Sequence, residues 1–293
     1  MIKRTGFAET AQAALYYEVW ESSAGGENAQ VRGKSVPAGV DGPAERTPLV
    51  MLHGNGEDHH IFDRMAEIMS RKFRVILMDS RGHGASRPGA CLKRDGMFTI
   101  EDMAGDVIEV LDALGEGEAA LLGFSDGANI ALEAASRFPD RITAVAAVSG
   151  NALPWGVTPG FFLTVQAQYP LYWLRERLAR SEEAKREMRR KRQLTALMAF
   201  CPRLTARRLG EIRCPVLLLT GRRDMIRPRH SLWMAEQIPG AELVFVRGAD
   251  HFTMLKRPAA YARCIGRWLE RCLQPGRWES RLQTDGGQHM KAR

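Results

Sequence analysis

The sequence predicts an α/β fold, in which a mostly parallel central sheet has helices on both faces and a helical insertion. Short, continuous apolar runs alternate along the 293 residues with longer segments whose apolar residues recur at helical spacing. One such run changes into a helical pattern at Gly123-Phe124-Ser125-Asp126-Gly127, which places a serine between two glycines. Residues 151–213 contain no strand-like run. Together these observations predict a layered core with one helical insertion.

The expected elements follow in chain order. A weak alternation predicts a strand at 16–21, and residues 22–47, rich in Gly, Ser, Pro and polar side chains, predict a long connection. Continuous apolar runs predict strands buried on both faces at 49–52 and 75–78, and further strands at 119–122, 142–148, 216–219 and 243–246. Apolar residues at helical spacing predict helices at 61–69, 99–114, 128–138, 231–238 and 259–273. Thr99 with Asp102 forms an N-terminal capping pattern for the second helix, and Gly115 marks its end.

This order divides the chain into a core, residues 1–150 and 214–273, and a helical lid, residues 151–213. Residues 274–293 lose the apolar periodicity, which predicts a flexible tail. The insertion is rich in aromatic residues at its start, so we expect a lid over the carboxyl edge of the sheet. An ordinary packed helical extension is the alternative. The aromatic residues expected to line a substrate pocket are Trp155, Phe161, Phe162 and Trp173.

Composition is ordinary for a globular protein, with 45% hydrophobic and 26% charged residues. No apolar stretch reaches the roughly 18 residues of a membrane span, and the first residues lack the apolar core of a signal peptide. The cysteines show no C-x-x-C spacing, which argues against a disulfide framework and a structural zinc site. A cytoplasmic location is therefore expected. The five cysteines are Cys91, Cys201, Cys214, Cys264 and Cys272.

The net charge of +8 is concentrated in part within a basic run at 185–192. Such runs usually form a solvated helix face. An anionic membrane or a phosphate-rich partner is the alternative. No nucleic acid is expected, because residues 186–193 contain no aromatic side chain among the basic ones. No sequence signal indicates the oligomeric state.

Three strand ends carry side chains suited to nucleophilic catalysis. A serine on a sharp strand-to-helix turn is held in a strained backbone conformation that exposes its hydroxyl above the sheet, as expected for Ser125. Asp224 follows the strand at 216–219, and His251 follows the strand at 243–246. Parallel strands collect such groups at their carboxyl edge, so these residues form a candidate nucleophile, orienting acid and base.

Each of these assignments has an alternative. The alternative for Ser125 is an ordinary serine in a turn, and the strand before it and the helix after it argue against this alternative. Asp250, directly before the histidine, competes with Asp224 as the acid. His53, His83 and His230 compete with His251, but only His251 follows the last strand.

With these motifs in this order, the chain resembles the α/β-hydrolase superfamily over residues 48–273. Ser125 matches the nucleophile of that family, Asp224 its acid and His251 its base. His53-Gly54-Asn55-Gly56 is similar to the loop that supplies part of the oxyanion hole, and residues 79–86 are similar to a structural turn. The resemblance implies that the backbone N–H groups of Asn55 and Asp126 stabilise the oxyanion. It implies no metal and no organic cofactor.

Asp126 has two interpretations. The simpler interpretation is structural, because a carboxylate in the first turn of a helix interacts favourably with the helix macrodipole. Some hydrolases of amino-acid esters resemble this chain in having G-x-S-D-G at the same turn, which suggests that Asp126 binds a cationic group of the substrate.

The predicted function is hydrolysis of a small or medium carboxylic ester, which includes a thioester or lactone, through an acyl-enzyme. Haloalkane dehalogenases and epoxide hydrolases use an aspartate nucleophile, so Ser125 argues against both. A C–C bond hydrolase, an amidase and a haloperoxidase-like enzyme are alternatives on the same fold. A non-catalytic ligand-binding member is the alternative from another class, and the absence of a long apolar surface segment argues against a lipase.

Overall fold

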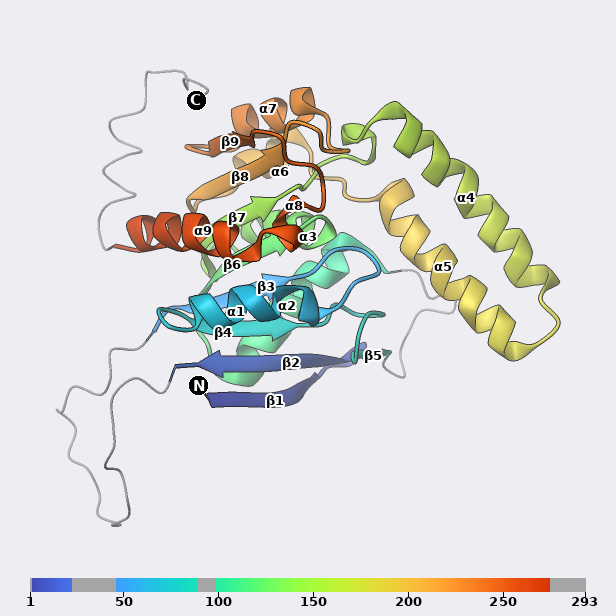
Figure 1. Cartoon of the computed structure of the whole chain (residues 1–293). Helices are drawn as coiled ribbons and strands as arrows, with labels where there is room; N and C mark the ends of the chain where they lie inside the picture. The colour runs from blue at the N-terminus through green and yellow to red at the C-terminus, as the bar shows by residue number, and fades with distance from the viewer. Residues whose placement is uncertain (1, 23–45, 89–97, 275–293) are drawn as a thin grey trace, which may run out of the picture.

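A single mixed sheet forms the centre of the molecule, and helices cover both of its faces (Figure 1). This computed structural model describes residues 2–22, 46–88 and 98–274. The strands are β1 Ile2–Glu9, β2 Ala13–Glu21, β3 Pro48–Leu52, β4 Arg74–Met78, β5 Arg87–Pro88, β6 Ala119–Phe124, β7 Ile142–Val148, β8 Val216–Gly221 and β9 Glu242–Val246. They lie in the order β1-β2-β4-β3-β6-β7-β8-β9, and the short β5 pairs with β2.

The sheet is parallel from β4 to β9, as the continuous apolar runs predict. Alternate residues of its central strands enter different cores, because successive side chains of a strand point to opposite faces. In β3, Val50 and Leu52 pack into one core, and Leu49 and Met51 pack into the other.

The antiparallel edge differs from the prediction. Strand β2 begins at Ala13, three residues before the predicted start, and β1, which pairs with it, is absent from the prediction. Most residues of β1 are exposed and several are charged, because this strand lies at the edge of the sheet. It therefore carries neither an apolar run nor a clear alternation.

Two layers of helices enclose the sheet. Helices α1 (Asp63–Met69) and α9 (Pro258–Cys272) pack on one face, and α2 (Ile100–Leu114), α3 (Asp126–Arg137) and α7 (Pro228–Gln237) pack on the other. The capping box of Thr99 with Asp102 and the left-handed Gly115 bound α2 as predicted. The predicted helix 61–69 begins as a 3-10 turn, η1 (His59–Phe62), because the Asp58 side chain accepts the His60 N–H.

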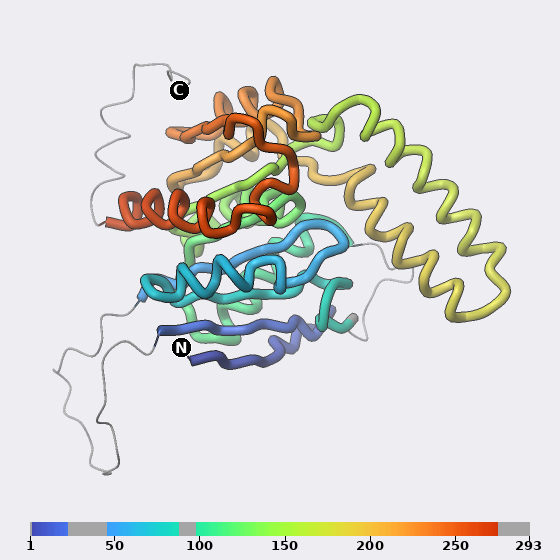
Figure 2. Tube along the Cα trace, viewed as in Figure 1, coloured from blue at the N-terminus to red at the C-terminus, as the bar shows by residue number. Residues whose placement is uncertain are grey.

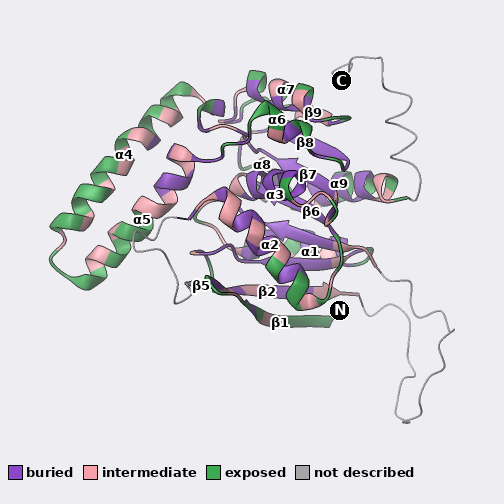
Figure 3. Ribbon diagram, turned by 180° about the vertical axis from the view of Figure 1, so that it is seen from behind, coloured by how far each residue is buried: buried purple, intermediate pink, exposed green. Residues whose placement is uncertain are grey.

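The insertion consists of helices. After a short 3-10 turn, η2 (Pro154–Gly156), helices α4 (Pro159–Leu178) and α5 (Glu182–Phe200) form a long antiparallel hairpin beside the sheet (Figures 1 and 2). A further helix, α6 (Ala206–Gly210), packs against α3 and α7 and returns the chain to β8. Viewed from behind, α4 and the first half of α5 are largely exposed (Figure 3).

Parts of the predictions lie outside the described residues. These parts are residues 23–45 of the long connection, residues 275–293 of the tail, and Cys91. Among the residues that the structure describes, no helix is both long and apolar enough to cross a bilayer.

Helix α3 begins so close to the sheet that two glycines are required. A Cβ atom on Gly123 would overlap the backbone of Gly127 and Ala128, and one on Gly127 would overlap the backbone of Leu52 and His53. The backbone itself would have to move to accept either one. The two glycines therefore set the distance between α3 and strands β3 and β6.

We expect Gly127→Ala to lower the free energy of unfolding by about 3 kcal/mol or more, because backbone atoms cannot move aside as a flexible side chain does. Gly105→Ala, inside α2 where a new Cβ atom meets nothing within 4 Å, is the matched control. It should raise the free energy of unfolding by roughly 0.5–1 kcal/mol. Urea unfolding measures both, and equal effects would contradict the role of Gly127.

Candidate active site

Ser125, His251 and Asp224 meet at the carboxyl edge of the sheet. Ser125 Oγ lies 3.1 Å from His251 Nε2, and His251 Nδ1 lies 2.7 Å from Asp224 Oδ1. An ionised carboxylate accepts hydrogen bonds and donates none, so the proton of the neutral imidazole lies on Nδ1. Nε2 is then free to accept the proton of the Ser125 hydroxyl. The arrangement can deprotonate a serine for nucleophilic attack.

The backbone of Ser125 is strained in the way that the strand-to-helix turn predicts. Its φ of 54° and ψ of −119° lie in a region that residues with a Cβ rarely adopt. Hydrogen bonds hold this conformation: the Ser125 N–H donates to the carbonyl of Val148, and the Ser125 carbonyl accepts the N–H of Ala128. The hydroxyl consequently points away from the helix and toward His251.

The carboxylate of Asp224 is fixed by groups besides His251. Its Oδ2 accepts a hydrogen bond of 2.6 Å from the Ser149 hydroxyl, and its Oδ1 also accepts the N–H of Ile226. Burial would raise the pKa of Asp224, but the hydrogen bond and charge of His251, with the bonds from Ser149 and Ile226, bring it below its ordinary value. Asp224 is therefore held in its charged form.

The sequence motifs did not predict a role for Ser149. It follows β7, its N–H donates to the Leu219 carbonyl of β8, and its φ of 56° is left-handed. A serine at the end of a core strand, next to the strand that precedes Asp224, is the signal that could have identified it.

The competing acid and bases lie elsewhere. Asp250 faces outward, where it pairs with Lys256 at 2.6 Å. His53 donates from Nδ1 to the carbonyl of Gly54, His83 lies in ring contact with His53, and His230 accepts the N–H of Ala152. Burial lowers the pKa of both His83 and His230 to about 4, so these rings are neutral.

Asn55 and Asp126 lie on either side of Ser125 and are joined by their side chains. Asn55 Nδ2 donates to Asp126 Oδ2 at 2.9 Å and to the carbonyl of Leu194 in α5 at 3.0 Å. Asn129 Nδ2 donates to the other oxygen, Asp126 Oδ1. Burial raises the pKa of Asp126, and the hydrogen bonds from Asn55 and Asn129 act against that rise. Both oxygens of this carboxylate are thus engaged within the protein.

The backbone N–H of Asp126 begins α3, where the first N–H groups of a helix have no partner within the helix. The N–H of Asn55 belongs to the loop directly opposite, as the side-chain contact between the two residues requires. The side-chain contact thus brings the Asn55 loop against the start of α3, beside Ser125.

A cavity of about 210 Å³ opens above Ser125. Most of its walls are apolar, and they come from both the core and the insertion. Of the four aromatic residues predicted to line a pocket, Phe161 lies on this wall, whereas Trp155, Phe162 and Trp173 do not. Trp155 and Trp173 are 56% and 41% exposed. The lining residues are Asn55, Glu57, Phe124, Ser125, Asp126, Asn151, Val157, Phe161, Met198, Cys201, Met225, Ile226, His251 and Phe252.

Glu57 and Cys201 are polar residues of this wall that no sequence motif includes. Glu57 accepts the N–H of Gly54, and burial raises the pKa of its carboxyl although that bond acts against the rise. Burial also raises the pKa of the Cys201 thiol to about 11, which leaves it a neutral thiol. Neither the spacing nor the type of these residues distinguishes them before the chain is folded.

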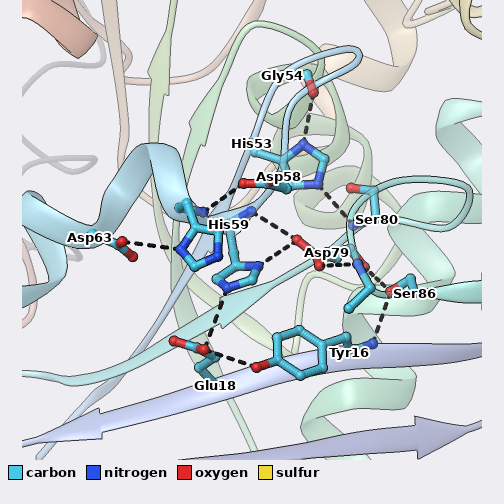
Figure 4. A network of polar contacts seen from close by, with 12 residues as sticks. Tyr16, Glu18, His53, Gly54, Asp58, His59, Asp63, Asp79, Ser80 and Ser86 are labelled. Atoms are coloured by element: carbon cyan, nitrogen blue, oxygen red, sulfur yellow. Dashed lines mark hydrogen bonds and ion pairs between the residues drawn. The ribbon is translucent and has the colours of Figure 1, made fainter.

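A buried polar network supports the loop that carries Asn55 (Figure 4). Asp79 accepts the backbone N–H and the Nδ1–H of His59, each at 2.8 Å, and His59 Nε2 lies 3.4 Å from the carboxylate of Glu18. His53 Nε2 accepts the N–H of Ser80, which ties the same loop to the turn after β4. These contacts fix the loop from beneath.

Asp58, His59 and His60 bring ligand atoms within 4.8 Å of one another, which is close enough for a metal ion. Their side chains already have partners, however. Asp58 caps η1, His59 pairs with Asp79, and His60 lies 3.1 Å from Asp63. These contacts favour a structural role for the three residues.

We expect Ser149→Ala to lower kcat by tenfold to a hundredfold with little change in KM, because a hydrogen bond to a charged group contributes about 1.5–3 kcal/mol. Ser149→Gly also removes the hydroxyl but relieves the left-handed backbone. It should lose the same activity while its free energy of unfolding is higher than that of the alanine variant. A kcat unchanged in both variants would contradict the positioning role.

The stability contributed by His59 should depend on pH. Burial would lower the pKa of His59, but Asp79 and Glu18 together raise it above its ordinary value of about 6.5. A raised pKa stabilises the fold fully below the unfolded value and loses this contribution as pH rises through the folded value. Unfolding measurements should therefore show that His59→Gln costs more free energy near pH 5.5 than near pH 9. A cost that grows with pH would contradict this assignment.

Comparisons with known proteins identify the family of this chain. The α/β hydrolase fold family model matches residues 47–200. A pimeloyl-[acyl-carrier protein] methyl ester esterase of Nitrosomonas europaea is 27% identical over 74% of this chain and 93% of its own length. A putative carbamate hydrolase RutD of Agrobacterium fabrum is 30% identical over 73% and 90%. The enol-lactonase from Burkholderia xenovorans LB400 superposes with a TM-score of 0.64 at 21% identity, over 88% of this chain and 97% of that one. The chain therefore belongs to the α/β hydrolase fold family.

Proposed function

We propose that this protein is a serine hydrolase that cleaves a small or medium carboxylic ester through an acyl-enzyme. The observation that carries the proposal is the continuous chain of contacts from Ser125 Oγ through His251 to Asp224, beside a largely apolar cavity. The esterase and hydrolase names of the relatives support the same reaction class.

The geometry supports the following sequence of steps. His251 Nε2 takes the proton of Ser125 as Oγ attacks the ester carbonyl, and Asp224 stabilises the imidazolium that results. The N–H groups of Asn55 and Asp126 stabilise the oxyanion. His251 then returns the proton to the leaving alcohol, which leaves an acyl group on Ser125. Water, deprotonated by the same His251, attacks this acyl-enzyme and releases the acid.

We assign the insertion, residues 151–213, the role of a lid within this function. It contributes Val157, Phe161 and Met198 to the cavity wall, opposite the core residues Phe124 and Phe252. The carbonyl of Leu194 in α5 also holds the Asn55 side chain. The lid therefore excludes water from the acyl group and helps to position the oxyanion loop.

The amide contacts of Asp126 favour positioning over binding of a substrate cation. Its two oxygens accept hydrogen bonds from Asn55 and Asn129, which already offset much of the cost of its burial. We propose that Asp126 aligns the two oxyanion N–H groups. The expected cytoplasmic location remains part of the proposal and rests on the cysteine usage.

The proposed triad predicts a sharp contrast between two neighbouring carboxylates. Asp224→Asn should reduce kcat on a p-nitrophenyl ester by about 10⁴, because the amide favours the wrong tautomer of His251. Asp250→Asn, which removes an outward-facing carboxylate one residue from His251, should leave kcat within twofold. Ser125→Ala should abolish labelling by a fluorophosphonate probe. Persistent labelling of the alanine variant would exclude Ser125 as the nucleophile.

The size of the cavity predicts a preference for short acyl groups. A volume of about 210 Å³ lies below the 300–1,000 Å³ typical of drug-sized ligands. Across p-nitrophenyl esters, kcat/KM should be highest for acetyl to butyryl groups and fall at least tenfold by octanoyl. Replacing Phe161 by Ala should shift the optimum to longer chains. A lactone, a carbamate and an amide complete the panel, and a strong preference for one of them would revise the substrate class.

A further inference from the structure

The outward face of α4 carries apolar side chains where a surface helix ordinarily carries polar ones. Leu163, Leu171, Leu174 and Leu178, the outer leucine row, recur at helical spacing and are 65%, 42%, 47% and 69% exposed. The opposite face packs against α5, and Val165 is the buried residue of α4. A helix that is apolar on both faces is normally covered on both. The outer leucine row therefore indicates a surface that meets a partner.

Positive charge surrounds this row. Residues 175–192 contain nine Lys or Arg and four Glu, so more than half of the net charge of +8 lies at this end of the hairpin. On the helix, Arg175 and Arg177 lie on opposite sides of Leu174 and Leu178. The guanidinium of Arg177 also lies over the exposed ring of Trp173, 4.1 Å from its centroid.

We propose that the outer leucine row and its flanking arginines dock the protein on an anionic phospholipid surface. Leucine flanked by arginine, with a tryptophan beside one of the arginines, is a set of side chains that inserts into the boundary between headgroups and acyl chains. Basic residues near such a surface are attracted by its negative potential. A second copy of this chain fits less well, because the contact would bring two hairpins of like charge together.

The position of the hairpin suits this docking. Helices α4 and α5 extend beside the sheet, with α5 between α4 and the core (Figure 1). Phe161 at the start of α4 and Met198 near the end of α5 line the cavity above Ser125. The outer leucine row thus begins at Leu163, two residues from Phe161, and ends at Leu178, at the far end of α4 from the cavity. The docking itself requires no catalysis, so it stands even if the proposed function fails.

Vesicle co-sedimentation of the full chain tests the proposal, in the Ser125→Ala background so that no lipid is hydrolysed. The protein should bind phosphatidylcholine vesicles containing phosphatidylglycerol at least tenfold more tightly than pure phosphatidylcholine vesicles. The Leu171→Ser/Leu174→Ser/Leu178→Ser variant should lose at least tenfold in binding. Leu232→Ser, which alters an exposed leucine on α7, is the matched control and should bind unchanged.

Two double variants, each lacking two arginines, distinguish binding through this surface from general electrostatic attraction of a basic protein. Arg175→Gln/Arg177→Gln should lower binding by about tenfold or more, given roughly fivefold for each basic residue at the surface. Arg263→Gln/Arg267→Gln removes the same charge from exposed positions of α9 and should change binding less than twofold. Equal losses in the two pairs would overturn the proposal.

Two further outcomes would overturn it. The first is no binding to anionic vesicles at low salt by the Ser125→Ala protein with its leucine row intact, when circular dichroism shows that it is folded. The second is a dimer, measured by light scattering, that the three serine substitutions abolish, because the outer leucine row would then be an interface between copies of this chain.

Discussion

The close approach of α3 to strands β3 and β6 is the contact on which the site depends. Gly123 and Gly127 lack the Cβ atoms that would meet the backbone of neighbouring segments, so the helix can begin directly above the strand ends. The chain must then turn within one residue, which places Ser125 at a φ of 54°. The same turn points the first N–H groups of α3 toward the Asn55 loop. One packing constraint consequently sets the positions of both Ser125 and the start of α3, the proposed nucleophile and the proposed source of an oxyanion donor.

Two polar networks support this site from different sides of the Asn55 loop. Asp79, His59 and Glu18 form an ionic network beneath the oxyanion loop, where burial strengthens each interaction and makes an unpaired group costly. Above it, Asn55, Asp126 and Asn129 join the loop to α3 through amide contacts. The loop is thus held from both sides, which is the rigidity that the proposed oxyanion donor on this loop requires.

The insertion has different physical character at its two ends. Near η2 and the end of α5 it is buried against the core and lines the cavity, as Val157 and Met198 show. Toward the turn between α4 and α5 it is exposed, apolar on its outer side and strongly basic. One hairpin thus lines the cavity at its base and carries the proposed docking surface toward its tip.

The sequence by itself determined the order of strands and helices in the core, because strands buried on both faces need continuous apolar runs. It also indicated that Ser125, Asp224 and His251 follow the ends of three core strands, β6, β8 and β9, because parallel strands bring such ends to one edge. Strand β1 was not predicted from the sequence, because an exposed edge strand carries no apolar pattern. Only the tertiary structure decided that Ser149 holds Asp224, that Glu57 lines the cavity, and which side of α4 faces solvent. These contacts join residues that are far apart in the chain. The periodicity of apolar residues indicates which side of one element is buried, but it does not indicate which other element covers that side.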